Sequence, residues 1–212
     1  MRPHRLPALL PTLLLAAACT TEGVTTAAAR PGVLRVQLTD APFPFDSVRT
    51  VDVWVVRVDA RLAEGDSADA ARGAPDDSAS AGGWVTLVRP DRAFDLLTLR
   101  NGTIATLGQD TLPPGRYRGL RLVLDPSRSR VTLVDGTVLH GGSTPSVTFP
   151  SGARSGLKVT VTQPIVVGAD STSTVLLDFD LEQSFVMRGN SIRRNGLLFT
   201  PVIRAAPRVV AG

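Results

Sequence analysis

Alternation of apolar and polar residues at every second position is the feature that most constrains this fold. It runs through residues 33–38, 119–124 and 175–182, and residues 50–60 are dense in valine. A β-strand places successive side chains on opposite faces, so this period predicts half-buried strands. Helical spacing is nearly absent, and only residues 94–99 favour a short helical turn. We therefore predict an all-β domain.

The valine-rich segment changes phase part-way along. Val51, Val53 and Val55 share one parity, whereas Val56 and Val58 share the other. An extra residue in one strand of a pair produces such a shift. We predict a β-bulge near Val55 and Val56.

Turn signals separate these segments. Asp135-Gly136 lies between two apolar runs and predicts a hairpin with a two-residue type I′ turn, which would place His140 opposite Val131. Asn101-Gly102 and residues 113–115 are further turns. Short strands joined in this way favour a sandwich or barrel. We expect an antiparallel β-sandwich with Greek-key topology, prealbumin- or immunoglobulin-like.

The first 18 residues have the pattern of a secretory signal. Arg2 and Arg5 give a positive start, and residues 6–18 are uncharged and end in small residues. The apolar run is shorter than the ~20 residues that a bilayer-spanning helix needs. We expect residues 1–18 to be removed on export.

Cys19 is the only cysteine and stands at the expected cut. This junction resembles the lipobox of bacterial lipoproteins, which implies that Cys19 is lipidated and becomes the new N-terminus. Two or more acyl chains anchor a protein stably. Residues 19–32 would then be the lipidated cysteine and a flexible tether, whose dozen small polar residues reach roughly 20 Å. By the same resemblance, Thr20 after the cysteine favours the outer membrane if the cell has two membranes.

The rest of the chain suits one domain. We predict a single β-sandwich over residues 33–206 and a tail over residues 207–212. Residues 62–83 contain no aromatic and no β-branched residue, so they bury too little apolar surface to offset ordering entropy. We interpret them as a disordered hairpin insertion.

The charge of the exported part is small. Without Arg2 and Arg5, the 23 basic residues become 21, which against 19 acidic residues leaves +2. A nucleic-acid face needs clustered cations, and the arginines are scattered along the sequence. We expect no nucleic-acid partner.

Most catalytic patterns are missing. His140 is the only histidine after residue 18, and no Gly-x-Ser-x-Gly turn accompanies it, so we expect a structural histidine. Ser155 and Lys158 have serine–lysine spacing, but glycine and a strand-like run favour Lys158 on the outer face of a strand. One histidine and a lipidated cysteine cannot build a zinc site. We expect no cofactor other than calcium.

Two aspartates inside one predicted strand are the strongest site candidates. Asp178 and Asp180 share a face about 7 Å apart. With Asp40 or Asp46 they could ligate calcium, they could be a glycosidase pair, or they could be structural. Asp40 before Pro42 also fits an Asx turn that ends the first strand.

Several segments resemble a bacterial and archaeal lipoprotein family known as domain of unknown function 4382. This resemblance implies an exported β-sandwich on a lipid anchor and brings no catalytic residue with it. The matching segments, in order, are residues 38–42, 94–97 with Asn101-Gly102, 112–117 leading into Arg121-Leu122, 150–152, 155–158, 178–181 with Ser184, and 201–204.

These observations favour a membrane-anchored, envelope-exposed lipoprotein without enzymatic activity. We expect a binding or adhesion module that uses loops at one end of the sandwich, with an unknown protein or glycan as ligand. The alternative is a structural envelope lipoprotein that docks to another membrane protein. A hydrolase built on Asp178 and Asp180 is the third reading.

Overall fold

The computed structural model describes residues 30–40, 45–63, 84–99, 102–150 and 155–208. The prediction of an all-β domain is confirmed, and the helices of the described residues are single turns. The strands are β1 Gly32–Asp40, β2 Val48–Leu62, β3 Trp84–Val88, β4 Arg92–Asp95, β5 Ala105–Leu112, β6 Gly115–Leu124, β7 Arg130–Leu133, β8 Val138–Leu139, β9 Val147–Thr148, β10 Leu157–Val161, β11 Ile165–Val167, β12 Thr172–Phe179, β13 Phe185–Met187, β14 Leu197–Phe199 and β15 Ile203–Arg208, with the 3-10 turn η1 Leu96–Leu99 and the helices α3 Leu181–Ser184 and α4 Ile192–Asn195.

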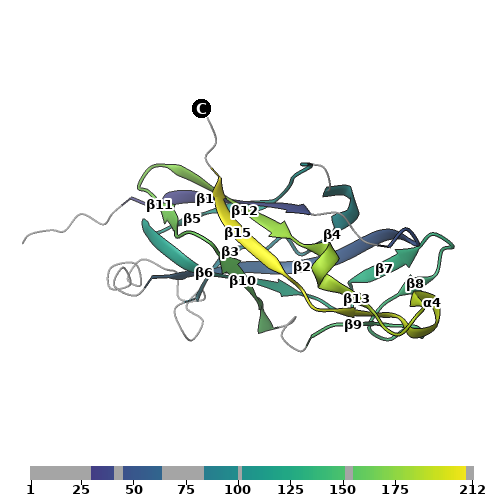
Figure 1. The fold of residues 1–212 in the computed structure, drawn as a ribbon. Helices are drawn as coiled ribbons and strands as arrows, with labels where there is room; N and C mark the ends of the chain where they lie inside the picture. The colour runs from purple at the N-terminus through teal and green to yellow at the C-terminus, as the bar shows by residue number, and fades with distance from the viewer. Residues whose placement is uncertain (1–29, 41–44, 64–83, 100–101, 151–154, 209–212) are drawn as a thin grey trace, which may run out of the picture.

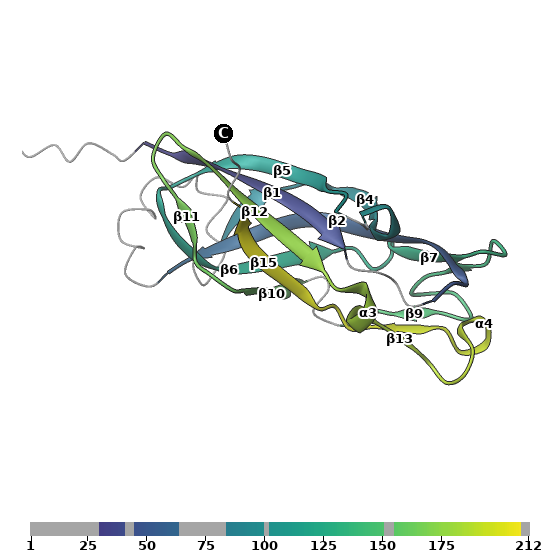
Figure 2. The same ribbon diagram turned by 45° about the horizontal axis from the view of Figure 1, so that its top comes forward.

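One large sheet curls around the core. Its strand order is β5-β1-β12-β15-β10-β6-β2-β7-β8, with β11 paired to β6 and with β3 and β4 paired to β2. A small sheet of order β13-β14-β9 completes the fold. The body is elongated: the start of β1 and β11 lie at one end, and the β7–β8 hairpin and α4 lie at the other (Figures 1 and 2).

The sheet is mixed, whereas the sequence analysis expected antiparallel strands throughout. β1 runs parallel to β12, β10 to β15 and β14 to β9. The turn signals that supported the antiparallel expectation report only on strands that follow each other along the chain. Strands far apart in the sequence, such as β1 and β12, leave no such signal.

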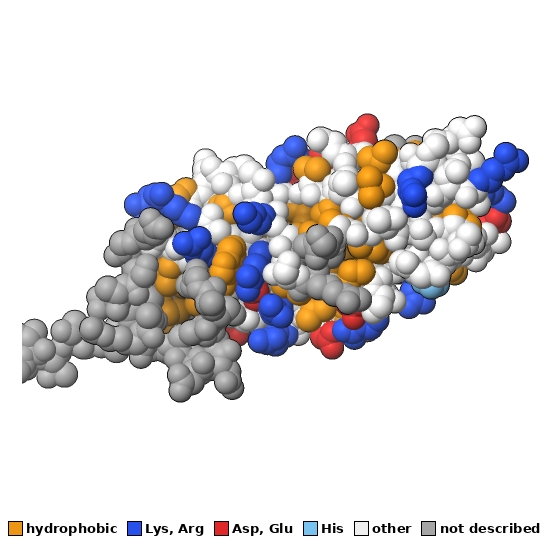
Figure 3. Space-filling model, turned by 90° about the horizontal axis from the view of Figure 1, so that it is seen from below, with side chains coloured by type: hydrophobic (Ala, Val, Ile, Leu, Met, Phe, Trp, Pro, Cys, Tyr) orange, Lys and Arg blue, Asp and Glu red, His pale blue; other side chains and the backbone are white. Residues whose placement is uncertain are grey.

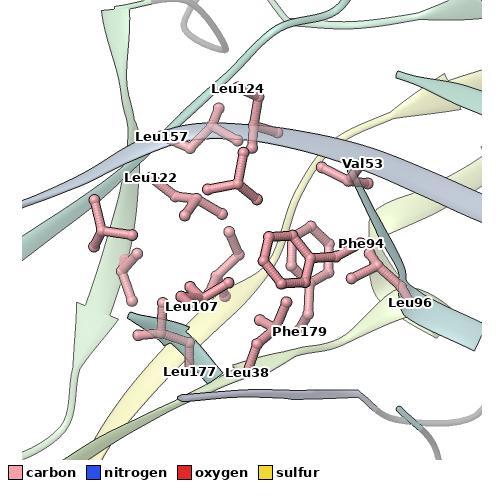
Figure 4. Packing of buried hydrophobic residues seen from close by; sticks show 14 of the residues in the cluster. Leu38, Val53, Phe94, Leu96, Leu107, Leu122, Leu124, Leu157, Leu177 and Phe179 are labelled. Atoms are coloured by element: carbon pink, nitrogen blue, oxygen red, sulfur yellow. The ribbon is translucent and has the colours of Figure 1, made fainter. Parts of the chain in front are cut away.

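The core lies between the two curved halves of the sheet. Apolar residues of β1 and β12 alternate inward, and they meet those of β2, β6 and β10. Phe179 also stacks on Phe199 of the small sheet with ring centroids 5.9 Å apart. Figure 4 shows side chains from both halves converging: Leu38, Val53, Phe94, Leu96, Leu107, Leu122, Leu124, Leu157, Leu177 and Phe179.

The predicted bulge in β2 is confirmed. Its pairing with β6 shifts register between Val55 and Arg57. Inward-facing burial follows odd positions from Val51 to Val55 and resumes at the even positions Val58 and Ala60. The shift keeps valines in the core on both sides of the bulge. It also aligns Arg57 and Asp59 on the outer face of the sheet.

The hairpin at Asp135-Gly136 is confirmed, but its predicted register is wrong. Val131 pairs with Leu139, not with His140. The loop has three residues and ends in Gly136 at φ 89°, as a type I turn followed by a left-handed residue requires. One extra loop residue moves each following side chain to the other face. His140 is therefore exposed, and Leu139 is buried in its place.

Two predicted boundaries change. β2 continues through Leu62, and Arg61 pairs with Trp84 at the start of β3, so the predicted insertion joins neighbouring antiparallel strands. β15 continues to Arg208 opposite Thr174, because pairing with β12 holds Pro207 and Arg208, which we assigned to the tail.

The predicted signal, Cys19 and most of the predicted tether lie outside the described residues, as do residues 64–83 and 209–212. Among the described helices, none has the length and apolar character to cross a membrane.

Candidate functional site

The structure brings three of the four candidate calcium ligands to one end of the sheet. Asp40 is buried at the end of β1, and Asp178 lies beside it in β12, opposite Thr39. Asp180 follows the last residue of β12. Asp46 is exposed in the turn before β2. In the described part of the chain, no three His, Cys, Asp or Glu side chains form a group able to hold a metal ion.

Asp180 is occupied by structural contacts. It is the N-cap of α3, and its carboxylate accepts from the Gln183 backbone N–H at 3.1 Å and from Gln183 Nε2 at 2.7 Å. Arg204 Nη1 donates to it at 3.2 Å. Burial raises the pKa of Asp178, the Asp180 charge raises it further, and Arg204 opposes both. The two aspartates are thus near enough for the charge of one to affect the other, but β12 ends at Phe179, so Asp180 lies outside the predicted strand and caps α3 instead.

A cationic surface covers the outer side of the neighbouring strands β2, β3, β6, β10 and β11. We call it the basic face and define it by Arg61, Trp84, Arg116, Arg118, Arg121 and Lys158. Four of these cations are exposed. A hollow of about 540 Å³ lies among Arg61, Trp84, Arg118 and Lys158. Figure 3 shows Lys and Arg side chains gathered beside exposed apolar ones on this side of the molecule.

A buried carboxylate organises the basic face. Asp59 is only 1% exposed, although it points outward from β2. It accepts from Arg121 Nε at 2.7 Å, from Arg57 Nε at 3.1 Å and from Thr86 Oγ1 at 2.9 Å. Both carboxylate oxygens are satisfied, as a buried charge requires. The pairing fixes the orientation of the Arg121 guanidinium.

Trp84 and two glycines complete this arrangement. Arg121 lies over the Trp84 ring, 4.7 Å from its centroid. A Cβ at Gly119 would stand 3.2 Å from Trp84 Cη2, so glycine lets the ring cross the strand. A Cβ at Gly156 would stand 2.7 Å from Arg121 Cδ. The predicted outward position of Lys158, after a tight glycine entry, is confirmed by its exposure and by φ 115° at Gly156.

A second hollow lies toward the end of the molecule opposite the start of β1. We call it the distal hollow; it has a volume of about 680 Å³. His140, which we expected on an apolar face, stands exposed at this hollow and accepts from the Gly142 N–H through Nδ1 at 3.2 Å. The lining residues are Pro126, Ser127, His140, Gly141, Gly142, Val147, Thr148, Phe149 and Pro150.

Hydrogen bonds hold the loops of the distal hollow in place. Ser143 Oγ accepts from the His140 N–H at 2.8 Å and donates to the Pro145 carbonyl at 2.6 Å. Phe149 packs edge-on against Phe199 with centroids 5.2 Å apart. Asp125 accepts from the Ser127 N–H at 2.9 Å. These contacts tie the loops at this end of the molecule to one another.

Asp125 belongs to an ionic cluster beside the distal hollow. Arg128 pairs with Asp125 at 2.7 Å and with Asp91 at 3.0 Å, and it lies over the Trp54 ring at 4.1 Å. Hydrogen bonds from Ser127 and then from Arg128 lower the pKa of Asp125 to about 2. Asp125 is thus ionised at neutral pH and holds Ser127 at the rim.

A family model described as a domain of unknown function, DUF4382, matches residues 31–197. The chain belongs to this family. The match runs from just before β1 to the first residue of β14 and includes every segment of the resemblance except residues 201–204. No curated protein and no solved structure matches the chain.

Several DUF4382 segments are explained by the structure. Asp95 accepts from the Val51 and Leu97 N–H groups, and Tyr117 donates to the Pro113 carbonyl at 2.9 Å. These contacts fix turns. Two further segments supply Arg121, Gly156 and Lys158, which meet on the basic face.

The sequence analysis missed the basic face because it interpreted the arginines as scattered. Lys158 pairs directly with Arg121, and Arg121 with Asp59, across three strands that are distant in the chain. For Arg61, Arg121 and Lys158 the available signal was their parity against inward-facing neighbours, whereas Arg116 and Arg118 share the parity of the buried Leu120 and Leu122. The strand order that brings them together carries no local signal.

Proposed function

We propose that this protein is a lipid-anchored envelope lipoprotein whose domain binds a protein or glycan ligand without catalysing a reaction. The N-terminal signal pattern and the lone Cys19 support the anchor. Thr20 after the cysteine supports an outer-membrane location in a cell with two membranes.

The distal hollow is the observation that carries the binding role. It lies toward the end of the elongated body opposite the point where the tether joins β1 (Figure 1). Its lining mixes backbone polar groups, a histidine, hydroxyls and apolar rings, the combination that small recognition sites use. A domain tethered at one end presents the other end to the surroundings.

Site-specific crosslinking in cells tests this role. A photo-reactive residue at Thr148, which is exposed in the hollow, is compared with one at Thr172, which is exposed at the start of β12. We expect a discrete conjugate from position 148 and none from position 172. Equal yields from both positions, or none from either, would contradict the proposal.

Exposed apolar residues favour docking to another membrane protein as the second candidate. Val134 and Val138 lie on one hairpin, and Val186 pairs with Leu198 across β13 and β14. If the protein docks to another membrane protein, the double variant Val186→Ser/Leu198→Ser should no longer be crosslinked to that protein in cells. Its glycan binding should be unchanged.

We also infer that the two curved halves of the sheet correspond to the layers of a prealbumin- or immunoglobulin-like Greek-key sandwich. Their opposed apolar faces support this (Figure 4). A crystal structure compared strand by strand with both fold types is the test.

Calcium at Asp40, Asp178 and Asp180 is a separate prediction: the three residues lie at one end of the sheet but do not form a ready metal-binding group, so calcium would have to draw their carboxylates together. Binding to the folded state alone raises the melting temperature. We expect a higher midpoint in millimolar calcium than in chelator; identical midpoints would end the calcium prediction.

A further inference from the structure

We propose that the basic face docks on the anionic lipid surface of the membrane to which Cys19 tethers the protein. This inference rests on the proposed lipid anchor and adds a second, electrostatic contact to it.

The strands that form the basic face carry more cations than carboxylates. Strands β3, β6, β10 and β11 contain no acidic residue, and the central Asp59 is shared by Arg57 and Arg121. Lys158 stands directly opposite Arg121 in the β10–β6 ladder. Like charges at paired positions destabilise a sheet. An external anion relieves this repulsion.

The basic face is also close to the tether. Gly32, the first residue of β1, packs against Val167 and the Gly168 carbonyl at the end of β11. β11 pairs with the first residues of β6, where Val166 lies opposite Arg116. Only twelve residues separate Gly32 from Cys19, and such a segment reaches roughly 20 Å. The lipid would therefore hold the face near the headgroups.

The residue types suit a lipid surface. Arg116, Arg118 and Lys158 are exposed, and Val166 is the most exposed large apolar side chain of the described residues at 58%. Trp84 supplies an aromatic ring of the kind enriched at bilayer interfaces. Four to eight clustered cations beside a membrane anchor are the usual signature of anionic lipid binding.

The lipid anchor strengthens membrane binding through a surface contact of this kind. Each cation near an anionic bilayer strengthens binding about fivefold, so four exposed cations alone bind weakly and reversibly. Tethering raises the effective concentration of the face at the membrane to the millimolar range. The two contacts together fix which side of the domain faces the bilayer.

Vesicle sedimentation tests the inference with the full-length Cys19→Ser chain, which carries no lipid. The vesicles contain phosphatidylcholine alone or with one third phosphatidylglycerol. We compare the parent with Arg118→Gln/Lys158→Gln, since neither side chain has an ion pair among those described. The control is Arg130→Gln/Arg194→Gln, which removes the same charge from exposed positions in β7 and α4 at the far end. All variants keep residues 64–83, including the acidic residues among them.

We expect the parent to prefer anionic vesicles and the Arg118/Lys158 variant to bind about 25-fold more weakly, two cations at about fivefold each. The control should lose less than threefold. Unchanged melting temperatures establish that all variants fold.

Three results would overturn the inference: equal binding to both vesicle types, equal losses in both variants, or displacement by inorganic phosphate beyond that by sodium chloride at matched ionic strength. The last would indicate a single-phosphate site. Fatty-acid labelling of Cys19 in the wild-type chain is scored separately, so failure of the anchor is distinguished from failure of the basic face.

Discussion

Asp59 shows how one residue outside the apolar core can stabilise the fold. The sequence places it among valines, where aspartate is disfavoured. The bulge turns it outward, and Arg57, Arg121 and Thr86 then bury it. The residue pattern pointed to Asp178 and Asp180 and not to Asp59, because two of the three partners of Asp59 come from other strands, β3 and β6.

Asp59→Asn should lower the free energy of unfolding by about 3 kcal/mol, since it leaves the half-buried Arg121 without its charged partner. The exposed pair Arg30–Asp170 provides the control: Asp170→Asn should cost less than about 1 kcal/mol. Urea denaturation measures both. Equal losses would show that burial does not set the strength of the Asp59 contacts.

Asp125 gives a pH prediction. Its pKa is lowered to about 2 in the folded state, so its contacts stabilise the protein above the unfolded value near 4 and are lost as pH falls toward 2. Asp125→Asn should destabilise the protein by roughly 1–2 kcal/mol at pH 7. The gap between variant and parent should close between pH 4 and pH 2, as followed by denaturant titration at each pH. A gap that stays constant would contradict the assignment.

At the scale of elements, the features that could be predicted are those set by residues close together in the chain. The β2 bulge appears in the parity of the valines, and the 3-10 turn at Leu96–Leu99 appears in residues 94–99. The hairpin at residues 131–140 was found, but its loop length was not, since Asp-Gly fits both two-residue and three-residue loops. The position of His140 at the distal hollow depended on that one residue.

Deletion of Val56 tests the bulge. Val56 is the unpaired extra residue, so without it Val55 and Val58 still face the core, Arg57 and Asp59 still face outward, and the β2–β6 ladder becomes regular. We expect the deletion to keep a cooperative unfolding transition by circular dichroism, and loss of that transition would contradict the position of the bulge. Val56→Ala keeps the backbone and should remain folded, because Val56 is only partly buried.

At the scale of the whole molecule, the all-β class and the family followed from the sequence, and the arrangement of strands did not. The parallel pairs β1–β12 and β10–β15 join segments more than forty residues apart. Those pairings set which residues share the outer surface. The basic face could therefore be found only once the strand order was known, while the distal hollow required the loop register as well.

Incorporation of labelled palmitate into the wild-type and Cys19→Ser chains tests whether a β-rich domain is held on a membrane by lipid at one cysteine. We expect label in the wild-type protein, none in Cys19→Ser, and an N-terminal fragment that begins at acylated Cys19 by mass spectrometry. An unlabelled wild-type protein, or a mature N-terminus at any other residue, would contradict it.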